Sequence, residues 1–263
     1  RQILILTLNF LNYFMNQFSN PTDTMYIPKI IHQVWSGIDK PLPKLSHVLG
    51  NTWKRDYPEW DYILWDNDKM NSFVQEYYPQ YWEAYNLFPY NIQRWDAIRY
   101  LFLYRFGGMY VDFDYESIRS IEPLIKGKTC CFSEEPETHK GGFGREVDRY
   151  FNNGMMLCVP NHPFMGKIIE AVFSDKGDLY DMHRFDYVLR TTGPWKLMNL
   201  YYDSKESERK DIYLIPKQYV TPFDYNQSRR FILEKERSEE LENCLKDAYA
   251  IHYFFSNWRK EIK

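Results

Sequence analysis

Cysteine is scarce in this chain of 263 residues: there are four cysteines, and no two of them form a CxxC pair. That spacing excludes a zinc site of the ribbon or finger type, and at this chain length a disulfide-framed secreted domain is not expected. The adjacent Cys130 and Cys131 lie in the strand-like run TCCFS, so we expect them to be buried thiols. Cysteine usage therefore favours a reducing compartment.

A long apolar run and an excess of one charge are also missing. The net charge of −3 gives none of the basic bias of a nucleic-acid binder, so no nucleic-acid partner is expected. The segment from Arg1 to Phe18 is short and rich in asparagine, whereas a membrane span needs about 20 apolar residues. It also has no small-residue cleavage site of the signal-peptide type. Residues 1–24 are either a leader appended before a start at Met25 or an apolar segment that docks on a membrane surface.

Aromatic residues are abundant, at 19% of the chain, within an otherwise ordinary soluble composition of 44% hydrophobic and 26% charged residues. Most of them are expected to build the core, although aromatic faces also stack on sugars and bases. The chain is long enough for one large domain or two small ones. We expect a single domain over residues 25–263.

Strand-like runs alternate with helical patterns along the chain. Strands are expected at Pro28–Trp35, Trp60–Trp65, Met109–Asp112, Lys128–Ser133, Met155–Val159, Asp211–Ile215 and Ala248–Phe255. Helices are expected at Leu45–Arg55, Lys69–Tyr77, Ile92–Phe106, from His162 onward and at Pro194–Tyr202. The charged segments Glu134–Arg149 and Ser204–Lys210 are expected to be loops or lids. This alternation predicts an α/β fold with a mostly parallel sheet, in which ligands bind at the carboxyl ends of the strands.

Two carboxylates mark the centre of the chemistry. Asp112 and Asp114 follow the strand-like MYV within the run RWDAIRYLFLYRFGGMYVDFD. Residues two apart on a strand face the same side, so both carboxylates address one point. Oxygen ligands in this pattern favour a divalent cation, and a cation that holds a diphosphate stabilises it as a leaving group. Because DxD pairs also occur by chance in loops, this hypothesis depends on the surrounding sequence.

The surrounding helix carries a charged pair, Asp96 and Arg99, which the i, i+3 spacing places on one face. The rest of the helix is apolar and aromatic, and it ends at Gly107-Gly108 directly before the strand. An exposed ion pair is one interpretation. If the helix is buried, its charges need partners, and a sugar or the Asp112/Asp114 site would provide them.

These segments together resemble glycosyltransferase family 32, the DxD-containing sugar transferases. The resemblance covers residues 26–258 and is carried by IPKIIHQVW, RWDAIRYLFLYRFGGMYVDFD, NNGMMLCVPNHPF, TTGP and IHYFFSNW. The helix and DxD core is also similar to the glucosyltransferase domain of large clostridial toxins. The resemblance implies a Rossmann-like GT-A fold, a nucleotide-sugar donor, Mn²⁺ or Mg²⁺, and retention of configuration at the anomeric carbon.

The resemblance also implies roles for individual residues. Asp96 and Arg99 would hold the donor sugar, and Asp112 and Asp114 would ligate the metal, which makes these four the catalytic set. His252 would complete the metal site, with Ser256 as the alternative, because Asn257 separates Ser256 from the tryptophan that many relatives have directly after it. The implied nucleotide-sugar contacts are Gln33, Trp35, Tyr110, Asn152, Asn153, Gly154, Ser256 and Trp258. Trp35 would stack on the base or belong to the core, and Thr191–Pro194 would line the acceptor cleft or merely begin a helix.

The expected function is therefore a metal-dependent retaining glycosyltransferase. It would transfer a hexose from a nucleotide sugar, and UDP-hexose is favoured over GDP-mannose as this donor. The acceptor would be a saccharide or a lipid-linked oligosaccharide in bacterial polysaccharide or glycan synthesis. We expect it in the cytoplasm, with peripheral contact at the inner face of the membrane. The alternative is an inactive relative that binds sugar nucleotides as a scaffold. A DxD phosphohydrolase fits poorly, because Asp112-Phe113-Asp114-Tyr115 lacks that chemistry's Thr or Val two residues after the nucleophile.

Overall fold

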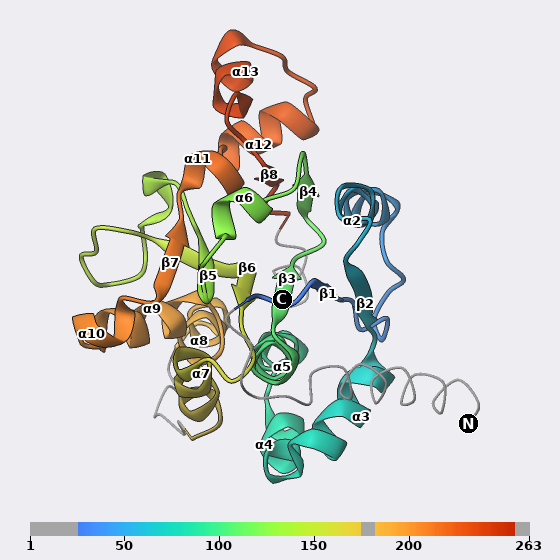
Figure 1. Cartoon of the computed structure of the whole chain (residues 1–263), viewed down its shortest axis with the longest axis vertical. Helices are drawn as coiled ribbons and strands as arrows, with labels where there is room; N and C mark the ends of the chain where they lie inside the picture. The colour runs from blue at the N-terminus through green and yellow to red at the C-terminus, as the bar shows by residue number, and fades with distance from the viewer. Residues whose placement is uncertain (1–25, 175–181, 256–263) are drawn as a thin grey trace.

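A six-stranded sheet forms the centre of the computed structural model, which describes residues 26–174 and 182–255 (Figure 1). Its strands lie in the order β2-β1-β3-β6-β5-β7. β6 runs antiparallel to both neighbours, and the other strands share one direction. The bounds are β1 Ile30–Val34, β2 Asp61–Trp65, β3 Gly108–Val111, β5 Cys130–Glu134, β6 Phe151–Cys158 and β7 Ile212–Ile215. The prediction of a mostly parallel α/β sheet is confirmed.

Helices cover both faces of this sheet (Figure 1). One face packs against α3 Asn67–Tyr77, α5 Asn91–Phe106, α7 Pro163–Ser174 and α9 Pro194–Asp203. The other face packs against α2 Lys44–Asp56, α6 Glu122–Ile125 and α11 Lys217–Val220. The remaining helices are η1 Pro79–Tyr81, α4 Trp82–Leu87, η2 Glu137–His139, α8 Arg184–Thr191, α10 Glu206–Arg209, α12 Tyr225–Ile232 and α13 Glu239–Leu245.

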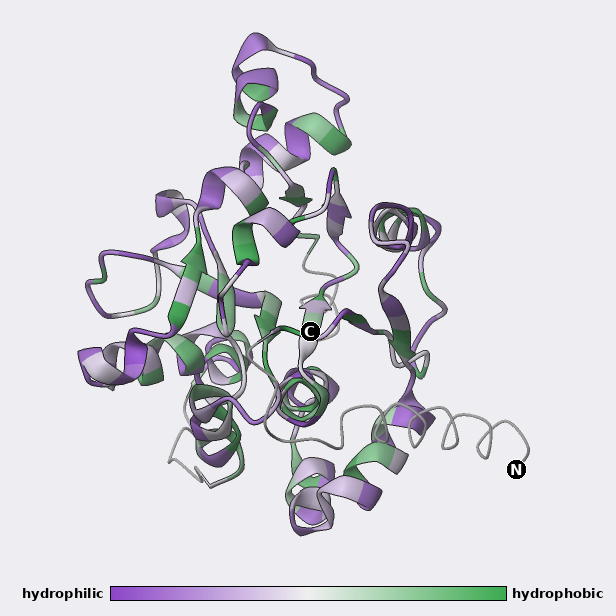
Figure 2. Cartoon of the chain, in the orientation of Figure 1, coloured by the Kyte–Doolittle hydropathy of each residue, from purple (hydrophilic) through white to green (hydrophobic). Residues whose placement is uncertain are grey.

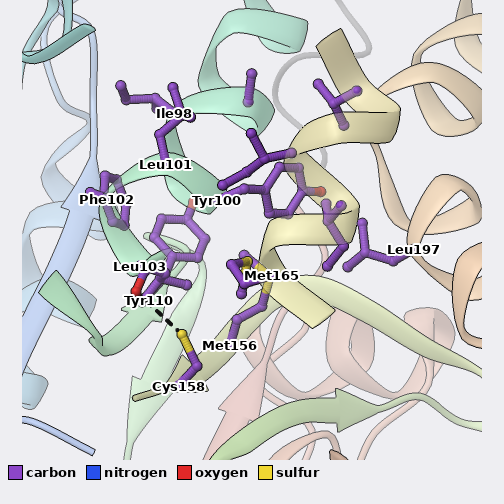
Figure 3. Packing of buried hydrophobic residues seen from close by; sticks show 14 of the residues in the cluster. Ile98, Tyr100, Leu101, Phe102, Leu103, Tyr110, Met156, Cys158, Met165 and Leu197 are labelled. Carbon is purple, nitrogen blue, oxygen red and sulfur yellow. Dashed lines mark hydrogen bonds between the residues drawn. The ribbon is translucent and has the colours of Figure 1, made fainter. Parts of the chain in front are cut away.

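Alternation along the strands explains the two cores. In β3, Met109 and Val111 belong to the cluster against α2 and α6, whereas Tyr110 belongs to the cluster against α5. Figure 3 shows the cluster against α5, in which α5 residues face Met156 and Cys158 of β6. The Cys158 thiol donates a hydrogen bond to the Leu103 carbonyl at 3.3 Å. Cys130, Cys131 and Cys158 are buried free thiols, which confirms the expectation for the adjacent pair.

Apolar residues are concentrated in the central strands and α5, whereas α10 and the projecting α12 and α13 are more polar (Figure 2). Within residues 26–174 and 182–255, no helix combines the length and the apolar character required to cross a membrane. The segment 1–24 lies outside the described residues.

A small second sheet brings residues 250–252 beside the segment that follows the DxD pair. It pairs β4 Tyr115–Ser117 with β8 Ala250–His252, so that Tyr115 lies opposite His252. The predicted strand at 248–255 is therefore shorter than expected, and β4 was not predicted. Likewise, the two segments predicted to be loops or lids contain short helices, α10 within 204–210 and η2 within 134–149.

Candidate active site

The carboxyl edge of the sheet gathers polar residues from four adjacent strands. Trp35 follows β1, Asp112 follows β3, and Glu135 follows β5. Because β6 is antiparallel, its first residues lie at this same edge, and the Asp112 N–H donates to the Gly154 carbonyl at 2.8 Å. A cavity of about 490 Å³ opens here. Of the predicted site residues, it is lined by Trp35, Asp96, Arg99, Tyr110, Asp112, Asp114, Asn152, Asn153, Gly154 and His252.

The structure does not bring every predicted residue to the cavity. Gln33 is fully buried away from it, with its amide donating to the Val111 carbonyl and accepting from the Tyr62 hydroxyl. The expected contact between Gln33 and the nucleotide is therefore not supported by its position. Ser256 and Trp258 lie outside the described residues, so their predicted contacts are not tested.

Asp96 and Arg99 form a buried pair on the cavity wall, each 5% exposed, with their side chains 3.2 Å apart. The alternative of an exposed ion pair is wrong. The Asp96 carboxylate also accepts hydrogen bonds from Asn153 at 2.9 Å and from Thr192 at 3.0 Å. Arg99 donates to the Asn153 carbonyl at 3.0 Å. Burial raises the pKa of Asp96, and the charge of Arg99 opposes that rise. The buried charges thus have the partners that their burial requires.

Arg99 also links this pair to the DxD motif. Its guanidinium lies 3.5 Å from an Asp112 oxygen and over the ring of Tyr110, whose hydroxyl donates to the same carboxylate. Burial raises the pKa of Asp112 to about 6, Arg99 opposes this rise, and the nearby charge of Asp114 adds to it. Asp112 is therefore held in place by a cation and a hydroxyl beside a second carboxylate.

Asp114 is held by residues 250–255, which we call the C-terminal segment. Its carboxylate lies 3.2 Å from His252 Nε2 and accepts the Phe255 N–H at 2.9 Å. Burial alone would raise the pKa of Asp114, but His252 and these hydrogen bonds outweigh burial and lower it. For His252, burial acts to lower the pKa and Asp114 raises it, with a net rise. The His252 ring stacks on Tyr115 with centroids 4.1 Å apart, which fixes its orientation.

These three side chains fit a divalent cation. One ligand atom from each of Asp112, Asp114 and His252 lies within 4.8 Å of the other two. Two carboxylates and an imidazole suit Mn²⁺, and His252 Nδ1 is buried without a hydrogen-bond partner among the described residues. A Cβ at Gly154 would lie 2.9 Å from an Asp112 oxygen, so this close approach requires glycine. Of the two predicted candidates for the third ligand, His252 lies in this cluster, and Ser256 lies outside the described residues.

Trp35 lines the cavity beside Phe113, the residue between the two aspartates. Its ring is half-buried and meets Phe113 edge-on, with centroids 6.1 Å apart, and its Nε1 donates to the Lys40 carbonyl at 3.0 Å. It is therefore anchored on the cavity wall rather than enclosed in the core. Base stacking by Trp35 stays a prediction.

Sequence reasoning missed several residues of this site. Thr192 belongs to the motif assigned to the acceptor cleft, but its hydroxyl supports Asp96, while Pro194 lines the cavity. Glu135 and His139 line it as well. The signal for Glu135 was its place two residues after the predicted strand Lys128–Ser133, near the strand end where other site residues lie. His139 had no signal, because the charged segment around it predicts only a loop or lid.

The chain is similar in sequence to known proteins. Residues 43–130, which include Asp96 and the DxD pair, match the family described as glycosyltransferase sugar-binding region containing DXD motif. Inositol phosphoceramide mannosyltransferase 1 of Schizosaccharomyces pombe is 32% identical over 198 residues, 68% of this chain and 58% of that protein. A mannosyl phosphorylinositol ceramide synthase of Saccharomyces cerevisiae is 31% identical over 169 residues, 64% of this chain and 40% of that protein. The chain thus spans about half the length of these relatives.

The fold has a counterpart among solved structures. The PaToxG glycosyltransferase structure superposes with a TM-score of 0.51 at 16% identity, covering 91% of this chain and 96% of that one. At this identity the likeness shows a shared GT-A fold.

Proposed function

Since the chain belongs to the DXD-containing glycosyltransferases of family 32, we propose that it is a metal-dependent, retaining hexosyltransferase. It would use a nucleotide-sugar donor and a hydroxyl-bearing acceptor. One observation carries the proposal: the Asp112, Asp114 and His252 side chains converge in the same cavity as the buried Asp96–Arg99 pair. A scaffold has no need of this arrangement of buried charges, which costs stability.

The cation would be held by Asp112, Asp114 and His252. We favour Mn²⁺ over Mg²⁺ as this cation. When bound, the cation neutralises charge on the departing diphosphate. Arg99 and Tyr110 hold the Asp112 carboxylate in place, and the backbone of the C-terminal segment holds that of Asp114. The ligands are thus oriented before any donor arrives, which avoids reorganisation during the reaction.

Asp96, Arg99 and Asn153 would hold the hydroxyl groups of the donor sugar. Their mutual hydrogen bonds fix the side chains in one arrangement, so the sugar would be bound by a rigid wall. Such positioning is worth a large rate factor, because misplacement by about 1 Å can cost about 100-fold. No carboxylate of the described residues is assigned as a nucleophile, and we propose that the leaving phosphate accepts the proton of the attacking hydroxyl.

The names of the relatives bear on the donor and the acceptor. Both relatives above are named for mannosyl transfer to an inositol-phosphate ceramide. We therefore propose nucleotide-linked mannose, with GDP-mannose tested first, ahead of the UDP-hexose that the sequence favoured. The proposed acceptor presents a saccharide or polyol hydroxyl. Both relatives are fungal, and the expected bacterial polysaccharide context has no support from them.

A donor panel tests the proposal. Purified protein is incubated with GDP-mannose, UDP-glucose, UDP-galactose or UDP-N-acetylglucosamine and Mn²⁺, and nucleoside diphosphate release is measured with and without EDTA. We expect slow release from one donor that EDTA abolishes. Asp114→Ala should lower it by more than about tenfold, a barrier change of about 1.4 kcal/mol. The control Asp203→Ala removes an exposed carboxylate and should leave the rate unchanged.

Two other results would contradict the proposal. Tight, metal-dependent binding of a sugar nucleotide without any release would favour the inactive scaffold. Release that persists in EDTA or in Asp114→Ala would contradict the metal role.

A further inference from the structure

Glu135 lines the cavity and has one carboxylate oxygen without a hydrogen-bond partner among the described residues. It directly follows β5, and its side chain is 12% exposed. One oxygen, Oε2, accepts a hydrogen bond from His139 Nδ1 at 2.7 Å. Within residues 26–174 and 182–255, Oε1 forms no hydrogen bond or ion pair. A carboxylate fixed through one oxygen leaves the other available for a hydroxyl or amide donor.

His139 fixes the direction in which this oxygen points. The backbone N–H of Tyr225, at the start of α12, donates to His139 Nε2 at 3.1 Å. Nε2 is therefore the acceptor nitrogen, and Nδ1 carries the proton that it donates to Glu135. The His139 ring also packs edge-on against Phe254, with centroids 4.8 Å apart. His139 thus ties the Glu135 loop to α12 and to the C-terminal segment.

A second unpaired polar atom lies on the neighbouring strand. Asn152 of β6 accepts hydrogen bonds from Ser133 and from the Gly154 N–H, both at 2.8 Å, which fixes its amide. Its Nδ2 is buried and has no partner among the described residues. The unpaired Glu135 oxygen needs a hydrogen-bond donor, and a ligand hydroxyl group supplies one, while the buried Asn152 Nδ2 lies on the adjacent strand.

The order of the strands indicates which hydroxyl this is. Along the sheet edge, Trp35 follows β1, the DxD pair follows β3, Asn153 is the third residue of β6, and Glu135 follows β5. In the proposed function these positions take the base, the diphosphate and the donor sugar in turn, and Glu135 follows β5, the next strand in the order. A diphosphate would be repelled by this carboxylate, whereas an uncharged hydroxyl would not. We propose that Glu135 Oε1 binds a hydroxyl group of the acceptor and that His139 is its positioning residue.

This inference rests on the proposed function, and Glu135→Gln tests it. Because His139 donates to the side chain, the glutamine carbonyl would turn toward His139 and its NH₂ toward the cavity, so a donor would replace the acceptor atom. Glu137→Gln is the control, because Glu137 is on the same loop but is exposed and paired with Lys217. Two rates are measured with the donor and Mn²⁺: hydrolysis in water, and transfer to methyl α-D-mannopyranoside or myo-inositol.

We expect Glu135→Gln to lower kcat/KM for the probe acceptor about 10- to 100-fold, the range for a hydrogen bond to a charged group. Donor hydrolysis and the affinity for Mn²⁺ with nucleoside diphosphate should stay within about twofold of wild type. Unchanged transfer would overturn the assignment, as would an equal loss of transfer and hydrolysis. Wild-type hydrolysis with transfer to neither probe would overturn it as well. A wild type that turns over no donor would instead contradict the proposed function.

The role of His139 has its own readout. His139→Ala should lower transfer to the probe without lowering hydrolysis, since Glu135 loses its orientation. His139→Asn should restore most of the transfer, because its amide N–H can donate from near the position of Nδ1. If alanine and asparagine lower transfer and hydrolysis equally, His139 has no positioning role and this part of the inference fails.

Discussion

Asp96 and Arg99 are neighbours in the structure, but their substitutions should have different consequences. Asp96 contacts Asn153 and Thr192, whereas Arg99 also contacts Asp112 of the proposed metal site. Asp96→Asn should therefore lower turnover by at least about 100-fold through loss of sugar positioning. The affinity for Mn²⁺ with nucleoside diphosphate, which lacks the sugar, should barely change. Steady-state transfer and titration calorimetry measure the two effects.

Arg99→Ala should lower both turnover and the affinity for Mn²⁺ with nucleoside diphosphate. Removal of the guanidinium leaves the Asp112 carboxylate without its cationic neighbour, so the pKa of Asp112 should rise further and metal binding at neutral pH should weaken. If Arg99→Ala leaves metal-diphosphate affinity at the wild-type value, the link between the helix pair and the DxD motif has no energetic weight.

Trp35 is the residue at which nucleotide binding can be separated from catalysis. Its ring is anchored on the cavity wall through Nε1 and lies against Phe113, and it is not one of the three proposed metal ligands. Trp35→Ala should weaken binding of GDP or UDP by about 1–3 kcal/mol, the usual worth of base–aromatic stacking. Calorimetry on both forms measures this, with Trp95→Ala as the control at another part of the cavity wall. Equal affinities would remove the stacking role.

At the scale of elements, His32 joins β1 to α5 and β2. Its ring stacks on Phe102 with centroids 4.6 Å apart, Trp65 Nε1 donates to Nδ1 at 3.1 Å, and Nε2 donates to the Gly107 carbonyl at 3.0 Å. A proton on Nδ1 would face the Trp65 N–H, so the neutral ring is required. Burial lowers the pKa of His32 to about 3, although the hydrogen bond to Gly107 opposes this.

This arrangement predicts a pH dependence of stability. The folded pKa of about 3 lies below the unfolded value near 6.5, so the contribution of His32 is complete above pH 6.5 and is lost as the pH falls toward 3. Between pH 6.5 and pH 5 the loss should be about 2 kcal/mol, at about 1.4 kcal/mol per pH unit. Urea unfolding of wild type and His32→Gln at both pH values measures it. The exposed His47→Gln control should keep the wild-type slope, and an equal slope in His32→Gln would contradict the prediction.

The helices and strands that could be predicted from the sequence are those whose own residues carry a clear helix or strand pattern. The apolar helix ending at Gly107 and the strand before Asp112 were predicted almost to the residue. β4 was missed because three residues carry no periodicity and are a strand only through pairing with β8. The burial of the Asp96–Arg99 pair followed from its helix, but the role of Thr192 required contacts across 96 residues of sequence. Likewise, the positions of Gln33 and Glu135 relative to the cavity depend on their places in the sheet, which residue type alone does not predict. Gln33 lies away from the cavity, and Glu135 lines it.

At the scale of the whole molecule, the site joins segments that are far apart in the sequence. Asp112 and Asp114 follow β3, whereas His252 comes from β8, 138 residues beyond Asp114. A ligand that bridges them connects the central sheet to the C-terminal segment, and it binds the folded chain only. Such binding stabilises the folded state by about 2.7 kcal/mol at a ligand concentration of 100 times Kd.

For a chain of this length, that stabilisation should raise Tm by about 5–10 °C. We expect the rise with GDP or UDP plus Mn²⁺, a small rise with Mn²⁺ alone, and none with nucleotide in EDTA, because the diphosphate would then face Asp112 and Asp114 without a cation between them. Thermal melts followed by circular dichroism measure it. Asp114→Ala should lose the rise while Asp203→Ala keeps it. A full rise in EDTA would mean that the cavity binds the nucleotide without the metal site, and the pairing of the two carboxylates with His252 would then need another explanation.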